Sequence, residues 1–334
     1  MDTLPPPSPL APSNDPDSIL DREAHGVAAL GARLIGAMDT VVAGKHEVVE
    51  VSVATLLAGG HLLIEDLPGV GKTLLAQVLA RAVGGTFHRI QGTSDLLPGD
   101  ITGSMVPSGQ LDVDGMRFRP GPVFANIVVF DELNRATPRT QSALLELAEE
   151  STVTVDGVSH RLPDPFMLVA TQNPIDIAGT YGLGEGALDR FCAVVSPGRA
   201  SAASEVEVLT GRRGRSMLEA VEPVATPTEL ITARKVVASV QITDMVAAYV
   251  VELLDEIRND PRVRVGPSTR GGVAIVALAR AFAALEGRHY VTANDVVRAS
   301  VPALAHRVAG STSTVAAGRE IAAECVSRVA PATV

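Results

Sequence analysis

Apolar residues along this chain follow two patterns, and the change between them falls near residue 200. Before that point, segments of strand length alternate with stretches whose apolar residues repeat at helical spacing. The segments of strand length are 61–65, 87–91, 127–130, 166–170 and 193–195. Parallel strands are joined by helices that cover both faces of the sheet, and such strands are apolar along most of their length. The pattern therefore predicts a parallel sheet of five strands between two layers of helices.

Helices and one hairpin are predicted around these strands. Helical spacing runs through 22–58, where Ala43-Gly44 interrupts it, and again through 73–83 and 137–150. Residues 152–161 read TVTVDGVSHR, which alternates around Asp-Gly, the strongest short-range signal for a β-hairpin. A hairpin is therefore predicted between the helix 137–150 and the fourth strand.

Beyond residue 205 the pattern predicts a second, helical domain, because strand-like alternation almost disappears there. The stretch 244–259 carries one apolar stripe at helical spacing, formed by Val246, Tyr249, Val250, Leu253, Leu254 and Ile257. Thr292 and Asp295 have the separation of a capping box, which begins another helix. The predicted division is a disordered Pro/Ser-rich tail over 1–21, a sheet domain over 22–204 and a helical domain over 205–334.

Composition narrows the class of protein. The 334 residues are 46% hydrophobic, which suffices for one large and one smaller core. The tail has neither the basic start nor the apolar stretch of a signal peptide. No later stretch has the uninterrupted apolar length of a membrane span. We therefore expect a soluble, cytoplasmic protein without membrane insertion.

The net charge argues against a nucleic-acid-binding protein, and the positions of the histidines and cysteines argue against a structural metal site. A formal net charge of −10 argues against nucleic acid as the main partner, because neutralising phosphates requires clustered Lys and Arg. The seven histidines are scattered, and Cys192 and Cys325 lie far apart. That spacing does not fit a structural metal site or a redox pair, and we expect buried thiols in a reducing cytosol.

The segment EDLPGVGKT, residues 65–73, lies between the first predicted strand and the helix that follows it. Gly71, Lys72 and Thr73 match the end of the Walker A pattern, whereas Asp66 stands where that pattern begins with Gly. Backbone N–H groups from Gly69 to Thr73 would surround a β-phosphate, with Lys72 spanning the β- and γ-phosphates and Thr73 binding Mg²⁺. The alternative is a glycine-rich turn that binds no nucleotide.

The segment IVVFDE, residues 127–132, is an apolar strand that ends in Asp131 and Glu132. Such a strand downstream of a Walker A loop is the Walker B arrangement. Asp131 can hold the metal through water, and Glu132 can polarise the water that attacks the γ-phosphate. A buried strand ending in solvated acids explains the charges but not their position relative to the loop. The acidic pair also implies a further strand between the two motif strands, and 87–91 is available for it.

At this point the chain resembles the AAA+ ATPases, and more narrowly the MoxR family, over residues 27–310. The resemblance is carried by AGGHLLIEDLPGVGKT, RIQGTSDLLPGDITG, FRPGPVFANIVVFDELNRATPRTQSALLELAEE, VTVDG, ATQNP, GALDRF and GRHYVTANDV. Asp66 fits the family's own variation. The implied fold is an α/β AAA+ P-loop NTPase core, which is a parallel five-stranded sheet with helices on both faces and inserted β-hairpins, followed by a small all-α lid domain.

The resemblance implies roles for further polar residues. Asn173 in ATQNP matches the first sensor, which orients the lytic water, and the alternative is a polar turn residue. Arg190 in LDRF matches the arginine finger that reaches the neighbouring subunit's nucleotide, and the alternative is a local ion pair with Asp189. Arg270 in GPSTRGG matches the second sensor, although the usual proline of that turn is displaced. Arg135 resembles an arginine at the subunit interface, and a solvated charge explains it equally well.

The assigned site residues follow from the motifs and the resemblance together. The predicted nucleotide contacts are Val42, Gly44, Asp66, Pro68, Gly69, Val70, Gly71, Lys72, Thr73 and Leu74, the first two by position alone. The predicted catalytic residues are Lys72, Glu132, Asn173, Arg190 and Arg270, and the metal ligands are Thr73 and Asp131. Two insertions, 101–124 and 152–161, resemble hairpins that project to the pore or face of a ring. Ordinary surface β-ribbons are the alternative.

The implied function is Mg²⁺-dependent ATP hydrolysis at the subunit interfaces of a ring, expected to be hexameric. Hydrolysis would drive remodelling or maturation of a client protein, with a von Willebrand A domain protein as partner. A metal-chelatase motor subunit has the same fold and differs only in its partners. A DNA motor is a further alternative, although 152–161 offers a DNA backbone only Arg161 and a mostly neutral His160. The catalytic residues disfavour a scaffold that binds ATP without turnover.

Overall fold

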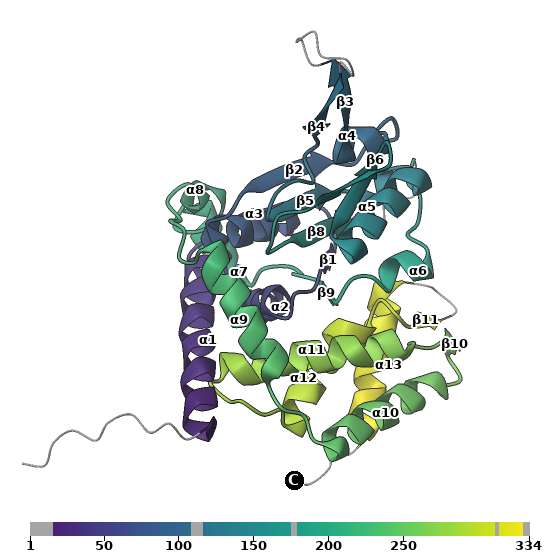
Figure 1. The fold of residues 1–334 in the computed structure, drawn as a ribbon. Coiled ribbons are helices and arrows are strands. Elements are labelled where there is room, and N and C mark those ends of the chain that lie inside the picture. Colours follow the sequence, from purple (N-terminus) through teal and green to yellow (C-terminus); the bar gives the residue numbers. More distant parts are fainter. Residues whose placement is uncertain (1–15, 108–115, 175–178, 311–313, 330–334) are drawn as a thin grey trace, which may run out of the picture.

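The computed structural model describes residues 16–107, 116–174, 179–310 and 314–329 (Figure 1). Five parallel strands form its central sheet in the order β2-β5-β8-β1-β9. The strands are β1 (Leu62–Glu65), β2 (Phe87–Gln91), β5 (Ile127–Asp131), β8 (Met167–Gln172) and β9 (Ala193–Val195). The five predicted strands are confirmed.

Side chains of successive strand residues enter two different apolar cores. Leu62 belongs to the larger core, which includes α2 (His46–Leu57) and α3 (Lys72–Val83). Leu63 belongs to the other core, which includes α5 (Pro138–Glu150). Because adjacent residues of a strand point to opposite faces, the sheet is covered on both sides, as predicted.

The strand order corrects one expectation. β8, and not β2, lies between β1 and β5, whereas β2 forms the edge of the sheet beside β5. Four of the five residues of β2 are exposed, while β8 is buried except at its last residue. An edge strand has one side open to solvent, so the mixed sequence FHRIQ suits the edge and the apolar β8 suits the interior.

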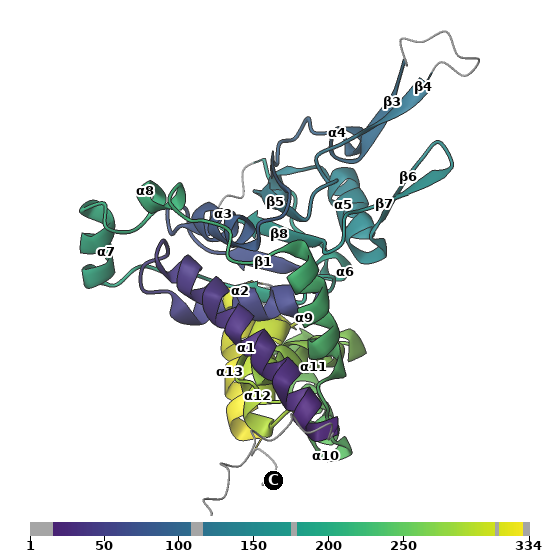
Figure 2. The ribbon, with the colours of Figure 1, turned by 60° about the vertical axis from the view of Figure 1, so that its left-hand side comes forward.

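Helix α1 (Pro16–Asp39) begins inside the predicted tail, so residues 16–21 are helical and not disordered. The rest of that tail, residues 1–15, lies outside the described residues. α1 packs against α9 (Pro227–Ser239) and α11 (Thr269–Leu285), two helices of the second domain (Figure 2). The first helix of the chain therefore contacts a domain that begins far away in sequence.

The chain after β9 is mostly helical. Besides α9 and α11 it forms α7 (Ala202–Leu209), α8 (Arg215–Leu218), α10 (Asp244–Arg258), α12 (Ala293–Leu304) and α13 (Val315–Arg328). The stripe of α10 is buried at every predicted position, and Thr292 and Asp295 form the predicted capping box. The domain is not purely helical, because β10 (Val263–Val265) pairs with β11 (Ala309–Gly310). Within the described ranges, no helix is both long and apolar enough to cross a membrane.

Two β-hairpins project from the same side of the sheet domain (Figure 2). Their strands are β3 (Gly103–Pro107), β4 (Met116–Pro120), β6 (Thr152–Val155) and β7 (Val158–Arg161). The predicted Asp-Gly turn is confirmed, with positive φ at Asp156 and Gly157. Residues 108–115, between β3 and β4, lie outside the described residues. The rings of Phe118 and His160 stack with centroids 4.0 Å apart, so the hairpins contact each other.

Candidate functional site

The predicted phosphate-binding loop connects β1 to the start of α3. Gly69 and Gly71 have φ values of +82° and +92°, and Gly71 caps the N-terminus of α3. An added Cβ would meet no atom within 4 Å at either position, so backbone conformation and not space requires glycine. The loop therefore presents the amino end of a helix, where N–H groups and the helix dipole favour an anion.

Lys72 lies at the first turn of α3 with its ammonium group turned onto the loop. Its Nζ donates to the carbonyl oxygens of Leu67, at 2.9 Å, and of Asp66. Burial lowers the pKa of Lys72, and the carboxylates of Asp66 and Glu132 are the main groups that oppose this shift. A cation is thus placed at the carboxyl edge of the sheet.

Asp66, predicted to contact the nucleotide, uses its carboxylate to hold the loop. Oδ1 accepts from the backbone N–H of Leu67 at 2.7 Å, and Oδ2 accepts from the N–H of Gly198. The side chain that replaces the first glycine of the motif therefore fastens the loop to the segment after β9. Its oxygens are turned to protein backbone and not to the neighbouring cavity.

Thr73 and Asp131, the predicted metal ligands, are brought together. Asp131 is buried at the end of β5, and its Oδ1 accepts from the Thr73 hydroxyl at 3.0 Å. A carboxylate and a hydroxyl are hard oxygen donors of the kind that Mg²⁺ uses beside phosphate and water. In the described part of the chain, no cluster of three or more His, Cys, Asp or Glu could hold a metal. The residues therefore fit Mg²⁺ delivered with a nucleotide and not an all-protein metal cage.

Two contacts of Asp131 were not predicted from the sequence. Arg89 Nε on β2 donates to Asp131 Oδ2 at 2.6 Å, and Thr171 Oγ1 on β8 donates to Oδ1 at 3.2 Å. Thr171 Oγ1 also accepts from the N–H of Glu132 at 3.0 Å. The signal that could have identified them is the strand order, because β2 and β8 flank β5. That order could not be derived from the apolar pattern alone.

Glu132 has a backbone conformation that is rare for its residue type. Its φ and ψ are 56° and 51°, in the left-handed region, where a non-glycine residue costs on the order of 1–3 kcal/mol. It precedes the short 3₁₀ helix η1 (Leu133–Arg135), and its Oε2 lies 2.8 Å from Arg135 Nε. The predicted catalytic base and the arginine of uncertain role therefore form an ion pair.

Asn173 directly follows β8, the strand between the two motif strands. Its carbonyl oxygen accepts from Asn134 Nδ2 at 3.2 Å. The preceding Gln172 donates to the buried carboxyl group of Glu65, and burial raises the pKa of that group. Because parallel strands end at one edge, Asn173 shares this edge with the loop and with Asp131.

A cavity of about 670 Å³ adjoins the loop. It is lined by the predicted residues Val42, Pro68, Gly69, Val70, Gly71 and Leu74, and by Leu209 and Arg215 from the second domain. Gly44 is not among the lining residues. Its φ is +65°, and an added Cβ would collide with the hydroxyl of Ser204. Gly44 is therefore explained by the turn before α2 and by packing, and not by contact with a base.

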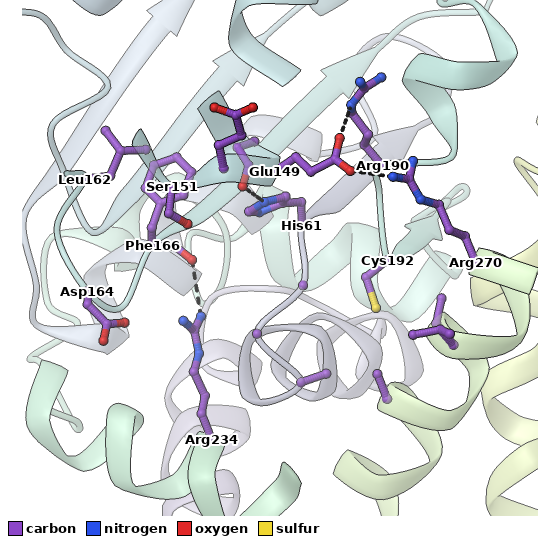
Figure 3. A pocket seen from close by; sticks show the side chains of 18 of the residues that line it. His61, Glu149, Ser151, Leu162, Asp164, Phe166, Arg190, Cys192, Arg234 and Arg270 are labelled. Carbon is purple, nitrogen blue, oxygen red and sulfur yellow. Dashed lines mark hydrogen bonds and ion pairs between the residues drawn. The ribbon is translucent and has the colours of Figure 1, made fainter. Parts of the chain in front are cut away.

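Arg190 and Arg270 lie together in a different cavity, of about 780 Å³, which shares no lining residue with the first (Figure 3). Glu149 Oε2 lies 2.8 Å from Arg190 Nε, and Glu149 Oε1 lies 2.5 Å from Arg270 Nη2. The local pair of Asp189 with Arg190 does not form, because Asp189 pairs with Arg307 at 2.7 Å. The structure therefore does not bring Arg270, the predicted second sensor, to the loop of its own chain.

Comparisons with known proteins are consistent with this arrangement. Residues 61–193 match the family described as "ATPase family associated with various cellular activities (AAA)", and residues 255–324 match the family described as "AAA lid domain". The boundaries of these matches enclose the loop, Asp131, Asn173 and Arg190 in the first family and Arg270 and Arg307 in the second.

Two relatives and one solved structure cover most of the chain. The uncharacterised protein YeaC of Bacillus subtilis is 42% identical over 81% of this chain and 84% of its own length. Chaperone MoxR1 of Mycobacterium tuberculosis is 37% identical over 83% of this chain and 74% of its own. The crystal structure of a proposed ATPase from Cytophaga hutchinsonii superposes with a TM-score of 0.82 at 29% identity, covering 94% of this chain and 98% of that one.

Proposed function

Because this chain belongs to the MoxR family of AAA+ ATPases, we propose that it hydrolyses ATP at contacts between the subunits of a hexameric ring and thereby remodels or matures a client protein in the cytoplasm. The relative named chaperone MoxR1 supports both the family and a chaperone-like activity. The ring, the client and a partner with a von Willebrand A domain belong to the proposal.

The observation that carries the proposal is that the loop and Arg190 line two different cavities. The two cavities share no lining residue, which supports the proposal that the loop and Arg190 of one chain belong to two different nucleotide sites. Arg190 is one-third exposed, and among the described residues its guanidinium group is bound by Glu149 and by the carbonyl oxygen of Gly186. A side chain placed in this way is available to a second subunit, which supports a site completed by two chains.

Within one site, the loop amides and the amino end of α3 would bind the β-phosphate. The Lys72 ammonium would exchange its two carbonyl partners for β- and γ-phosphate oxygens, which carry more negative charge. Thr73 and Asp131 would hold Mg²⁺, which supplies neutralisation of phosphate charge when it is bound. Arg89 must then share or release Asp131 Oδ2, because this oxygen is its ion-pair partner.

Glu132 would act as the base that accepts a proton from the attacking water, once its carboxylate leaves Arg135. Asn173 would orient that water from the neighbouring strand end. Arg190 of an adjoining subunit would stabilise the charge that develops on the transferred phosphoryl group. Such an arginine contributes on the order of 10³ to 10⁵ in rate, or roughly 4 to 7 kcal/mol.

One observation favours a DNA-dependent motor as a second candidate. β4 carries Arg117 and Arg119 beside the hairpin that carries Arg161, so the projecting hairpins offer more positive charge than 152–161 alone indicated. The net charge of −10 and the chaperone relative favour a protein client. A metal-chelatase-type motor differs only in its partners.

The test of the proposed function uses two single variants. Glu132→Gln and Arg190→Ala should each lower ATP turnover by at least about 10²-fold and leave the affinity for a fluorescent ATP analogue within about twofold. Retention of full turnover by Glu132→Gln would exclude Glu132 as the base. Stimulation of the wild type by single-stranded DNA, and not by proteins captured on the Glu132→Gln variant with ATP, would favour the DNA motor instead.

A further inference from the structure

Arg307, just beyond the end of α12 in the lid, is a buried cation that donates three hydrogen bonds to one short segment and one, from Nη1, to the carbonyl oxygen of Ala303 in α12. Its side chain is 4% exposed. Nε donates to Asp189 Oδ1 at 2.7 Å, and Nη2 donates to the carbonyl oxygens of Asp189, at 2.7 Å, and Phe191, at 2.8 Å. These two residues flank Arg190. The lid therefore holds the peptide unit that precedes the predicted arginine finger and the peptide unit that follows Phe191.

Two more lid residues contact the same segment. His306 is buried, and its Nε2 lies 2.9 Å from the carbonyl oxygen of Phe191. Burial lowers the pKa of His306 well below its usual value, so the ring is neutral and donates this bond. Ser268, which caps α11, donates to Asp189 Oδ2 at 3.4 Å. The segment is thus fastened to the ends of two lid helices.

The side chain of Arg190 is held differently from its backbone. Its partners, Glu149 and the carbonyl oxygen of Gly186, belong to the sheet domain, and its guanidinium is partly exposed. The backbone around Arg190 is therefore held by the lid, while its guanidinium group stays accessible. A side chain that acts on a neighbouring subunit requires both properties. A buried guanidinium destabilises the fold unless its hydrogen bonds are satisfied, and Arg307 donates three of its hydrogen bonds to Asp189 and Phe191.

We infer that Arg307 is a positioning residue for Arg190, and that through it the lid of one subunit controls ATP hydrolysis in the neighbouring subunit. The inference rests on the proposed function, because it assigns Arg190 to a neighbour's nucleotide. A rotation of the lid would move α12 and, through Arg307, the backbone of Asp189 and Phe191 on either side of Arg190. A displacement of about 1 Å in a positioned catalytic group costs on the order of 10²-fold in rate, so small lid movements suffice.

The experiment mixes subunits with complementary defects. The guanidinium group of Arg307 donates to the Asp189 carboxylate and to two carbonyl oxygens at once, and the single ammonium group of lysine cannot reproduce this geometry. Arg307→Lys alone should therefore turn over ATP about 10- to 100-fold more slowly, with binding of the fluorescent ATP analogue within about twofold of wild type. Lys72→Ala alone should not hydrolyse ATP, but its Arg190 should remain correctly positioned.

An equal mixture of Arg307→Lys and Lys72→Ala should be more active than either variant. In a cyclic ring, half of the nucleotide sites have the intact loop of an Arg307→Lys subunit. Half of those sites face the correctly positioned Arg190 of a Lys72→Ala subunit, so about a quarter of all sites are complete. A defect in folding or in the variant's own nucleotide site would not be rescued in this way. Absence of rescue, or wild-type turnover by Arg307→Lys alone, would overturn the inference.

Two controls keep the outcomes distinct. A mixture of Arg190→Ala with Lys72→Ala tests the proposed function itself, and if it shows no rescue, the two-chain site is wrong and not merely the role of Arg307. Arg262→Lys weakens another lid ion pair, with the buried Asp260, and should turn over ATP as the wild type does. If Arg307→Lys does not fold, Asp189→Asn removes the same ion pair with little change of shape and should behave alike in the mixture.

Discussion

At the scale of single residues, the site depends on one buried carboxylate that has more partners than the motifs indicate. Asp131 contacts Thr73, Arg89 and Thr171, from three different elements. The Walker patterns predicted Thr73 because both residues belong to known motifs. Arg89 and Thr171 could not be predicted, since their proximity depends on which strands flank β5. Asp66 lies in the loop where the motif begins, but its carboxylate accepts hydrogen bonds from the backbone N–H groups of Leu67 and Gly198 and does not face the cavity.

Arg89→Gln should destabilise the free protein more than the nucleotide-bound protein. Removal of Arg89 leaves Asp131 buried without its cation, at a cost of about 1–2 kcal/mol because Arg89 is itself partly exposed. Mg²⁺ bound with ATP would compensate the same carboxylate. Thermal unfolding with and without Mg-ATP measures this, and the expected result is a larger stabilisation by Mg-ATP in the variant than in the wild type. An equal loss of stability in both states would contradict the shared role of this oxygen.

At the scale of elements, the apolar pattern predicted which segments become strands and helices but not their neighbours. The central position of β8 corrects the expectation for 87–91. The mixed sequence FHRIQ suits an edge strand, but this contrast alone does not fix which strands are neighbours. Contacts between elements also depend on buried polar side chains that no motif marks. His61 is one of these, because its Nε2 donates to the carbonyl oxygen of Ala148 on α5 and its Nδ1 accepts from the N–H of Leu168 on β8.

The stability contribution of His61 should decrease in mild acid. Burial lowers its pKa below the usual 6.5, so as the pH falls the unfolded chain binds the proton before the folded chain does. Its contribution is complete above about pH 6.5 and decreases below that pH by up to about 1.4 kcal/mol per pH unit. Urea unfolding of wild type and His61→Gln should give a smaller pH slope below about pH 6.5 for the variant. His306 titrates in the same direction and is present in both proteins. Identical slopes would show that His61 does not titrate differently on folding.

At the scale of the whole molecule, the arrangement of the two domains decides what the arginines can reach. Arg190 and Arg270 both pair with Glu149 (Figure 3), in a cavity separate from the one beside the loop whose nucleotide the second sensor was expected to contact. Periodicity in a sequence contains no information on how a lid sits on a sheet domain. The same limit applies to α1, which packs on lid helices although it precedes the sheet. The two separate cavities support the central proposal about the assembly, which is that each ATP is cleaved by residues of two chains.

The measurement that tests this claim most directly is ATP turnover per subunit as a function of protein concentration, with the assembly state followed by sedimentation over the same range. We expect turnover per subunit to rise steeply where subunits assemble, and Arg190→Ala to assemble at the same concentrations without that rise. Turnover per subunit that stays constant down to concentrations where the chain sediments as a monomer would contradict the account.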